Sequence, residues 1–575
     1  MKNKFKRILL LVLILLTSFT LIGCDKKPKE VVDNEEFNLF LDEAFVELLG
    51  IDPLVINYML KYPEKLGIDN STVLPYSYTK EDDEEHFEIL KNLKNRLLEF
   101  DDKELSVSQI LTKKVFLDAL ESDISLEGFY GYKTVLDLSD GIQAMLPYQL
   151  TVYRFNTETD IDNYLDYIRC LKESFENAIA YETWRSNNNM GLTDSLIDQI
   201  IDQCDELINQ EENFLIASFN EKLDEVIFLD EASKAVKKQE LLSLLNNEFI
   251  EAYIYLKNAL IPLKGKITHN GSSSNYLKGK EFYEATLRAE LGSNLSVLKI
   301  EAYFEEKLAE LKAWYDENTD TYQDSVSIDL MEGLTLDSLI EFFQTKMEGL
   351  FPPLDEEIEY SILTFPEHMQ GSTTSAMYFT SPIDEITTEV IYLNPTYVGE
   401  VDNTLYLTVA HEGFPGHLYQ HVYLKTSNLH NVRKMFSYLA YAEGWTMYIE
   451  NEIVGFIDED AKKAFEYKNS AGPLKLCLLD IGIHYHGWSL EVATEYMNEN
   501  FNLTVNTPEF IYSVILENPM MYAPYMYGYF QVQELKTSFK ERLGEEYTDL
   551  AFHTALLDIG PAPFSILKEE LEKYN

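Results

Sequence analysis

The sequence predicts a large, mainly α-helical protein with a small β-sheet beside a helix that carries potential metal ligands. Three observations support this fold class. Apolar residues recur at helical spacing along most of the 575 residues. Strand-like alternation is confined to a short region before residue 400, and a group of histidines and glutamates follows that region directly. With 46% hydrophobic residues, the chain can bury a large core.

Residues 1–23 are expected to be an export signal rather than part of the fold. A basic start precedes the unbroken apolar run of residues 8–16, which is too short for a confident membrane span. The ending Leu-Ile-Gly-Cys resembles a lipoprotein signal box, which implies cleavage before Cys24 and lipid attachment to its thiol at the outer face of the cell membrane. A simple N-terminal anchor helix is the alternative, and it also tethers the chain. The polar residues 24–38 are then a short tether.

Long amphipathic helices are expected through the first half of the chain. We read residues 39–270 as an N-terminal helical subdomain and residues 271–575 as a metal-binding catalytic subdomain, with one cleft between them. The loop 268–275, rich in serine and asparagine, is the best candidate for the linker. The helices predicted from apolar spacing cover residues 36–50, 80–100, 106–122, 160–185, 193–222, 229–260, 277–292 and 296–317.

Strands are predicted at only two places. Residues 376–380 and 389–393 are short, rich in β-forming residues and joined by a turn around Pro382. They lie just before the segment with the potential metal ligands.

The formal net charge of −51 indicates a strongly solvated acidic surface. Such a body repels phosphate, so no nucleic-acid partner is expected. The four cysteines do not form a disulfide framework. Cys24 belongs to the lipid signal, and Cys477 lies in an apolar run where a buried thiol is the usual case. Cys170 and Cys204 could pair or could both be free.

The potential metal ligands are two imidazoles and a carboxylate. His411 and His417 flank a short glycine- and proline-containing segment, and Glu443 follows at a distance along the chain. This is a standard ligand set for a catalytic zinc that keeps a fourth position open for water. Glu412 follows the first imidazole directly, where a general base for that water would sit. We therefore expect a zinc-dependent hydrolase, and a peptidase above others.

The spacing of the two histidines requires a break in the helix. In the common zinc-peptidase helix the histidines are four residues apart, whereas His411 and His417 are six apart. On an unbroken helix they would be about a third of a turn out of line. Pro415 and the flanking Gly413 and Gly416 allow the helix to break and restart, which could bring both rings to one ion.

Other interpretations of these residues stay open. The histidines could lie near a helix break without a shared function, and His417 could instead pair with His421, four residues on. Glu443 could be an ordinary solvent-facing helix residue. The distribution favours a site, because six of the ten histidines lie between residues 411 and 486.

These residues resemble a known family. The segment His-Glu-Gly-Phe-Pro-Gly-His at 411–417, the Glu-Gly-Trp at 443–445, the stretch 480–489 and the Tyr-Met-Tyr-Gly at 525–528 resemble the bacterial DUF885 family, a domain of unknown function. The likeness implies a zincin-type metallopeptidase fold of the gluzincin kind. It also implies Tyr525 and His484 as donors to the oxygen that gains charge during hydrolysis. Asp480 lies one helical turn before His484 and could orient it. His484 and His486 could equally cap helix ends or bind carboxylates around the metal ligands. The chain departs from the family at residues 520–522, where it has Met-Met-Tyr, so the substrate preference stays open.

By analogy with zincin-type peptidases, the strand 389–393 is our candidate to pair with an extended peptide substrate. A purely structural hairpin is equally compatible with the sequence. The cations Arg433, Lys434 and Lys475 could bind a substrate carboxylate, or they could form surface salt bridges.

The leading hypothesis is a membrane-anchored zinc metallopeptidase in which Glu412 activates the water. The alternatives are a peptide- or solute-binding lipoprotein without turnover, and a zinc amidase that acts on non-protein amides. The retained Glu412 argues against simple binding, because binding needs no general base. The sequence does not decide between exo- and endo-cleavage.

Overall fold

The computed structural model describes residues 32–318, 335–354, 358–365, 375–385, 388–396, 401–501 and 507–574. The expected signal segment and Cys24 lie outside these ranges. The described chain is mainly helical and has one three-stranded sheet, as the sequence predicted. None of the described helices is long and apolar enough to span a lipid bilayer.

The elements follow one another in a simple order, with the sheet between the two helical halves of the sequence. The helices are α2 (Glu35–Leu49), α3 (Pro53–Met59), α4 (Lys80–Leu98), α5 (Val107–Ile124), α6 (Ile142–Val152), α7 (Glu158–Asn187), α8 (Asp194–Ile208), α9 (Leu215–Glu225), α10 (Glu231–Leu244), α11 (Ile250–Leu260), α12 (Gly279–Leu291), α13 (Val297–Asn318), α14 (Leu336–Met347), α15 (Asn403–Glu412), α16 (His417–Thr426), α17 (Asn431–Lys434), α18 (Leu439–Val454), α19 (Lys462–Ile481), α20 (Leu490–Asn500), α21 (Pro508–Glu517), α22 (Ala523–Leu543), α23 (Asp549–Ile559) and α24 (Phe564–Lys573). The strands are β1 (Glu359–Thr364), β2 (Ala376–Phe379) and β3 (Thr388–Leu393).

Most helix boundaries agree with the apolar spacing, and the exceptions have local causes. Helix α2 begins at Glu35, inside the range assigned to the tether. The Asn34 side chain accepts hydrogen bonds from two backbone N–H groups of the first turn, and Phe37 is fully buried. The helix predicted over 193–222 is divided into α8 and α9. The one predicted over 229–260 continues from α10 to α11 through a π-helical turn at Leu245–Phe249.

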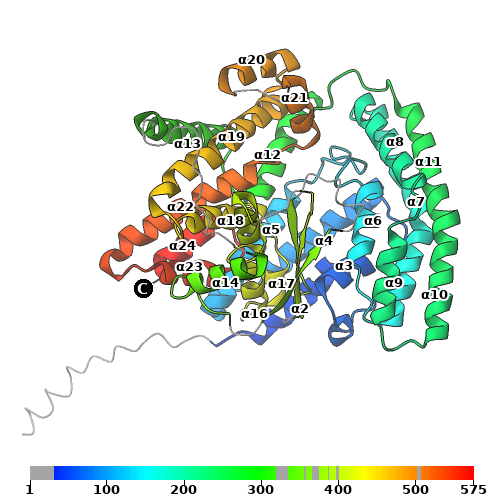
Figure 1. The fold of residues 1–575 in the computed structure, drawn as a ribbon, viewed down its shortest axis with the longest axis horizontal. Coiled ribbons are helices and arrows are strands. Elements are labelled where there is room, and N and C mark those ends of the chain that lie inside the picture. Colours follow the sequence, from blue (N-terminus) through cyan, green and yellow to red (C-terminus); the bar gives the residue numbers. More distant parts are fainter. Residues whose placement is uncertain are drawn as a thin grey trace, which may run out of the picture.

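The helices form two groups on either side of the sheet. Helices α7, α8, α10 and α11 make a bundle at one end of the molecule, and α18, α19, α22 and α24 lie toward the other end (Figure 1). Each group has its own core, one formed within residues 54–263 and a larger one that extends to residue 571. Helices α2, α4 and α5 share a third core, which also holds Ile383 and Val432. The first helices therefore pack against the metal-binding half, across the boundary that we predicted at residue 270.

The serine-rich loop 268–275 is attached to the body rather than free. Ser272 is fully buried, and its hydroxyl donates a 2.9 Å hydrogen bond to the carbonyl oxygen of Ile483. Cys170, Cys204 and Cys477 are free thiols, so the possible pairing of Cys170 with Cys204 does not occur.

The sheet has the strand order β1-β3-β2. Strands β2 and β3 are antiparallel, with Tyr378 opposite Ile391, as expected for the predicted hairpin. Strand β1 was not predicted, and it pairs parallel with β3 on the opposite side. Strand β3 is therefore central, and the outer strand next to helix α15 is β2.

Candidate metal centre

The helix breaks between the two histidines, as their spacing predicted. Helix α15 ends at Glu412 and helix α16 begins at His417. The connection is held by Trp445, whose indole N–H donates a 2.9 Å hydrogen bond to the Pro415 carbonyl oxygen. Only glycine fits at position 416, because a Cβ there would lie 1.9 Å from the His411 carbonyl oxygen. Because Gly416 has no side chain, the backbone at the start of α16 comes close to the last turn of α15.

Glu443 of helix α18 meets both imidazoles. Its Oε2 lies 3.6 Å from Nε2 of His411 and 3.5 Å from Nε2 of His417. Among the described residues, these three form the group whose potential ligand atoms all lie within 4.8 Å of one another. His421 does not join them, since its Nε2 bonds the Ser381 carbonyl oxygen at 3.0 Å. The structure thus favours the His411 and His417 pair over the pair formed by His417 and His421.

The electrostatics of this group fit a bound cation. Burial opposes ionisation of Glu443, yet the facing rings of His417 and His411 hold the pKa of its carboxyl well below the usual range. Glu443 Oε2 is nevertheless buried without a hydrogen-bond partner. A buried acceptor in this state is costly. Two imidazole nitrogens and a carboxylate oxygen are donors that zinc prefers, so the residues fit this metal.

Glu450 contacts the His411 ring at Nδ1, the nitrogen that does not face Glu443. It lies seven residues after Glu443 on helix α18, and its Oε1 is 2.8 Å from Nδ1 of His411. Its other oxygen accepts a 2.9 Å hydrogen bond from the Asn469 side chain. A carboxylate on Nδ1 makes this nitrogen the N–H donor and leaves Nε2 free to bind a metal. We did not predict this residue, although its two-turn separation from Glu443 on one helix face was a usable signal.

Glu412 points at the sheet edge. Its Oε2 accepts a 2.8 Å hydrogen bond from the backbone N–H of Tyr378 in strand β2. Our prediction that strand 389–393 offers its edge to a substrate is wrong, because β3 is paired on both sides. The strand that borders the site is β2. No sequence pattern could have indicated this contact, because its donor is a backbone group.

Tyr525 lies beside the two carboxylates. Burial and then the negative charges of Glu443 and Glu412 raise the pKa of its hydroxyl, so the phenol stays protonated at neutral pH. Its position follows from the crossing of helices α18 and α22, where a Cβ on Gly528 would lie 2.7 Å from the Gly444 Cα. This close approach brings the first turn of α22 against the helix that carries Glu443.

His484 has a different environment. Its ring is buried and stacks parallel to Tyr283, and its Nε2 lies 3.1 Å from the Ile515 carbonyl oxygen. The nearby Asp480 accepts a 2.8 Å hydrogen bond from the backbone N–H of Met520, just before helix α22. Among the described hydrogen bonds, none joins His484 to Glu412 or Glu443. The hydrogen bond to Asp480 fixes the backbone just before helix α22. Because none of its described hydrogen bonds reaches Glu412 or Glu443, we leave His484 out of the chemistry proposed below.

The comparisons with known proteins agree with the motif. The family model of a bacterial protein of unknown function, DUF885, matches residues 63–571. The chain belongs to this family. No curated protein is similar enough in sequence to count as a match.

Two solved structures are similar to this chain in fold. A predicted lipoprotein from Colwellia psychrerythraea is 17% identical, with a TM-score of 0.80 over 94% of this chain and 98% of that one. A predicted lipoprotein of unknown function from Shewanella oneidensis is 15% identical, with a TM-score of 0.60 over 93% of this chain and 99% of that one. At these identities the likeness establishes the fold alone.

A buried ion pair connects the sheet of this DUF885 chain to the second histidine helix. Lys425 of α16 and Glu389 of β3 are fully buried and paired. Glu389 also accepts hydrogen bonds from the hydroxyls of Tyr378 and Ser381. The network fixes strand β2 relative to helix α16, and this in turn places the Tyr378 N–H against Glu412.

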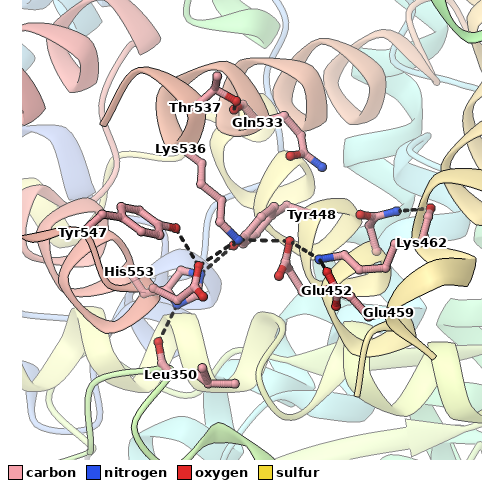
Figure 2. A network of polar contacts seen from close by, with 12 residues as sticks. Leu350, Tyr448, Glu452, Glu459, Lys462, Gln533, Lys536, Thr537, Tyr547 and His553 are labelled. Carbon is pink, nitrogen blue, oxygen red and sulfur yellow. Dashed lines mark hydrogen bonds and ion pairs between the residues drawn. The ribbon is translucent and has the colours of Figure 1, made fainter. Parts of the chain in front are cut away.

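The opposite face of helix α18 has a structural role. The Tyr448 hydroxyl is 2.7 Å from Nε2 of His553 and accepts a 2.8 Å hydrogen bond from Lys536 (Figure 2). Lys536 also pairs with Glu452 at 3.1 Å. Tyr448 therefore joins helices α18, α22 and α23.

A pocket of about 430 Å³ adjoins the candidate metal centre. His417 and Glu443 form part of its lining. The remaining walls are largely apolar and aromatic, and Glu443 is the one carboxylate among the lining residues that the structure describes. The lining comprises Tyr58, Met59, Tyr378, Thr380, Ser381, Ile383, His417, Gln420, His421, Leu424, Lys434, Met435, Phe436, Ser437, Tyr438, Leu439, Tyr441, Ala442, Glu443, Leu557 and Pro561.

Proposed function

We propose that this chain is a zinc-dependent peptidase, held at the outer face of the cell membrane by a lipid on Cys24. The observation that supports this proposal best is the group formed by His411, His417 and Glu443, with a buried oxygen of Glu443 that lacks a hydrogen-bond partner. Anchoring agrees with the Leu-Ile-Gly-Cys ending of residues 21–24 and with the two structural relatives, both predicted lipoproteins.

Different residues orient the metal ligands and the general base. His411 and His417 would offer Nε2 to zinc, and Glu450 would orient the first ring through Nδ1. Zinc bound there would supply a Lewis acid that polarises a carbonyl group and favours the ionisation of water. Glu412 would take the proton from the attacking water and pass it to the leaving amine. Its hydrogen bond to Tyr378 leaves one carboxylate oxygen available for this transfer.

Two further groups would act on the substrate. The Tyr525 hydroxyl, which stays protonated at neutral pH, would donate to the carbonyl oxygen as negative charge develops. The outer strand β2 would pair with the backbone of an extended peptide through its free edge. Both groups lie next to Glu412, so one substrate could contact all three.

The test combines metal analysis with digestion of a mixed peptide library. The purified full-length chain should contain zinc by mass spectrometry and should cleave peptides. Glu412→Gln should keep the zinc and the thermal midpoint but lose about 100-fold or more in turnover, the usual effect of removing a general base. The control is Glu452→Gln, which changes a carboxylate on the other face of α18 and should retain activity.

The same experiment separates the alternatives. If the wild type and Glu412→Gln are equally inert while both keep zinc and bind peptides, the chain is a binding lipoprotein. If the peptide library stays intact while non-protein amides are hydrolysed in a Glu412-dependent manner, the chain is an amidase. Absence of zinc from a folded sample would refute the metal centre itself.

A further inference from the structure

Two cations without an acidic partner among the described residues lie at or next to the pocket beside the candidate metal centre. Arg433 and Lys434 are neighbours in the short helix α17. Within the described part of the chain, no ion pair involves either of them. This is unusual here, because acidic residues outnumber lysine and arginine by 98 to 47. The structure thus removes the surface salt bridge as an explanation for these two residues.

Arg433 is a fully buried guanidinium that is only partly satisfied. Its Nη2 donates hydrogen bonds to the carbonyl oxygens of Ile559 at 2.7 Å and Pro561 at 3.1 Å. Its Nε and Nη1 have no hydrogen-bond partner. Tyr438 and Tyr441 lie next to it, and both line the pocket, as does Pro561. A buried charge without a counter-ion is costly unless an anion comes close.

Lys434 lines the pocket directly. Its ammonium group donates one hydrogen bond, of 2.9 Å, to the Lys425 carbonyl oxygen. An ammonium carries three donors, so two stay available for a ligand. The one histidine of the lining besides His417 is His421, and burial lowers its pKa to about 4, so this ring is neutral. Lys434 is therefore the one lysine or arginine among the described lining residues, and the one carboxylate there is Glu443, which belongs to the candidate metal centre.

Lys475 offers a comparison outside the pocket. It also donates to a backbone carbonyl oxygen, that of Asn500 at 2.8 Å, and its ammonium group lies over the ring of Phe501. It is absent from the pocket lining. Of the three cations that the sequence offered as carboxylate ligands, Lys434 lines this pocket, Arg433 lies behind it next to Tyr438 and Tyr441, and Lys475 lies elsewhere.

The size and the walls of the pocket restrict the occupant. A volume of about 430 Å³ is near the lower end of the roughly 300–1,000 Å³ that is typical of small-molecule sites. This is room for a residue or two, not for a long extended chain. Met435, Phe436 and Leu439 provide apolar walls close to Lys434 in the sequence. These walls favour an apolar side chain next to the positive end.

We propose that this pocket receives the C-terminal residue of a peptide, with its free carboxylate bound by Lys434 near the charge of Arg433. The inference rests on the proposed function and makes the chain an exopeptidase of the carboxypeptidase type. The last peptide C–N bond breaks, the oxygen of water joins the acyl carbon, and the proton passes to the amine. The products are a peptide one residue shorter and a free, apolar amino acid.

The test measures binding separately from turnover. The zinc-loaded Glu412→Gln chain is titrated by calorimetry with acetyl-Ala-Ala-Phe, with its C-terminal amide, and with acetyl-Ala-Ala-Glu amide. We expect the free acid of the Phe peptide to bind at least about tenfold more tightly than its amide, as for one charge-assisted hydrogen bond. Adding Lys434→Gln should remove this difference, whereas Lys434→Arg should retain most of it. Lys475→Gln is the matched control and should leave it unchanged.

The outcomes distinguish this inference from the proposed function. Equal binding of the Phe acid and its amide, or a difference that survives Lys434→Gln, would overturn the inference. Tightest binding of the Glu amide would also overturn it, because the carboxylate would then come from a side chain. If the wild type cleaves library peptides internally while acid and amide bind equally, the peptidase proposal stands and this inference fails. If the acid is preferred through Lys434 but nothing is cleaved, the carboxylate-binding site stands, and the peptidase proposal fails together with the carboxypeptidase activity.

Discussion

Replacing Glu450 by glutamine should weaken zinc binding without unfolding the chain. Glu450 contacts Nδ1 of His411 at 2.8 Å and is itself held by Asn469 at 2.9 Å. Glutamine keeps the size of the side chain but removes the negative charge that makes the imidazole a better ligand. Loss of such a partner typically costs about 10–100-fold in metal affinity. This corresponds to about 1.4–2.8 kcal/mol of binding free energy.

The assay is competition against a chromophoric zinc chelator at pH 7, with the thermal midpoint measured on the same samples. Glu452→Gln is the control, because Glu452 lies two residues further on helix α18 and pairs with Lys462 and Lys536 instead (Figure 2). A Glu450→Gln chain that binds zinc within a factor of two of the wild type would refute the reasoning. So would an equal loss of affinity in the control.

Two further predictions concern stability. Gly416→Ala should cost about 1–3 kcal/mol or more, because the new Cβ would overlap the His411 carbonyl oxygen, and zinc binding should fall with it. Urea denaturation measures the loss, and Gly472→Ala in helix α19, whose Cβ meets nothing within 4 Å, should not destabilise. Burial lowers the pKa of His553 to about 4, so the unfolded chain takes up a proton below about pH 6.5 that the folded chain does not. Stability should therefore fall by about 2 kcal/mol between pH 7 and pH 5 through this residue, and His553→Asn should remove that part of the pH dependence. An unchanged pH dependence in the variant, or a Gly416→Ala chain as stable as the wild type, would contradict these expectations.

The sequence predicted the helical fold well, and it selected the three residues that the structure brings together, His411, His417 and Glu443. Both results depend on local patterns. Apolar spacing located most helices to within a few residues, and the glycine and proline residues between His411 and His417 indicated the helix break. The failures were contacts between distant segments. Strand β1 gave no clear alternation, so the central position of β3 was missed and the substrate edge was assigned to the wrong strand. The role of His484, which was selected by its motif, stays a prediction, since its described hydrogen bond is to the Ile515 carbonyl oxygen.

By itself, the sequence identified the groups of the candidate metal centre: two imidazoles, a carboxylate and an adjacent base. Hydrophobic periodicity and the backbone preferences of glycine and proline act over a few residues, so they can be recognised from the sequence without a structure. Only the tertiary structure decided which groups surround that centre, namely Glu450 behind His411, the Tyr378 N–H on Glu412, and Lys434 in the adjoining pocket. These positions depend on how helices cross, as at Gly444 and Gly528, where backbones touch only because neither residue has a side chain. Such packing brings together residues that are distant along the chain, and no local sequence pattern predicts these contacts.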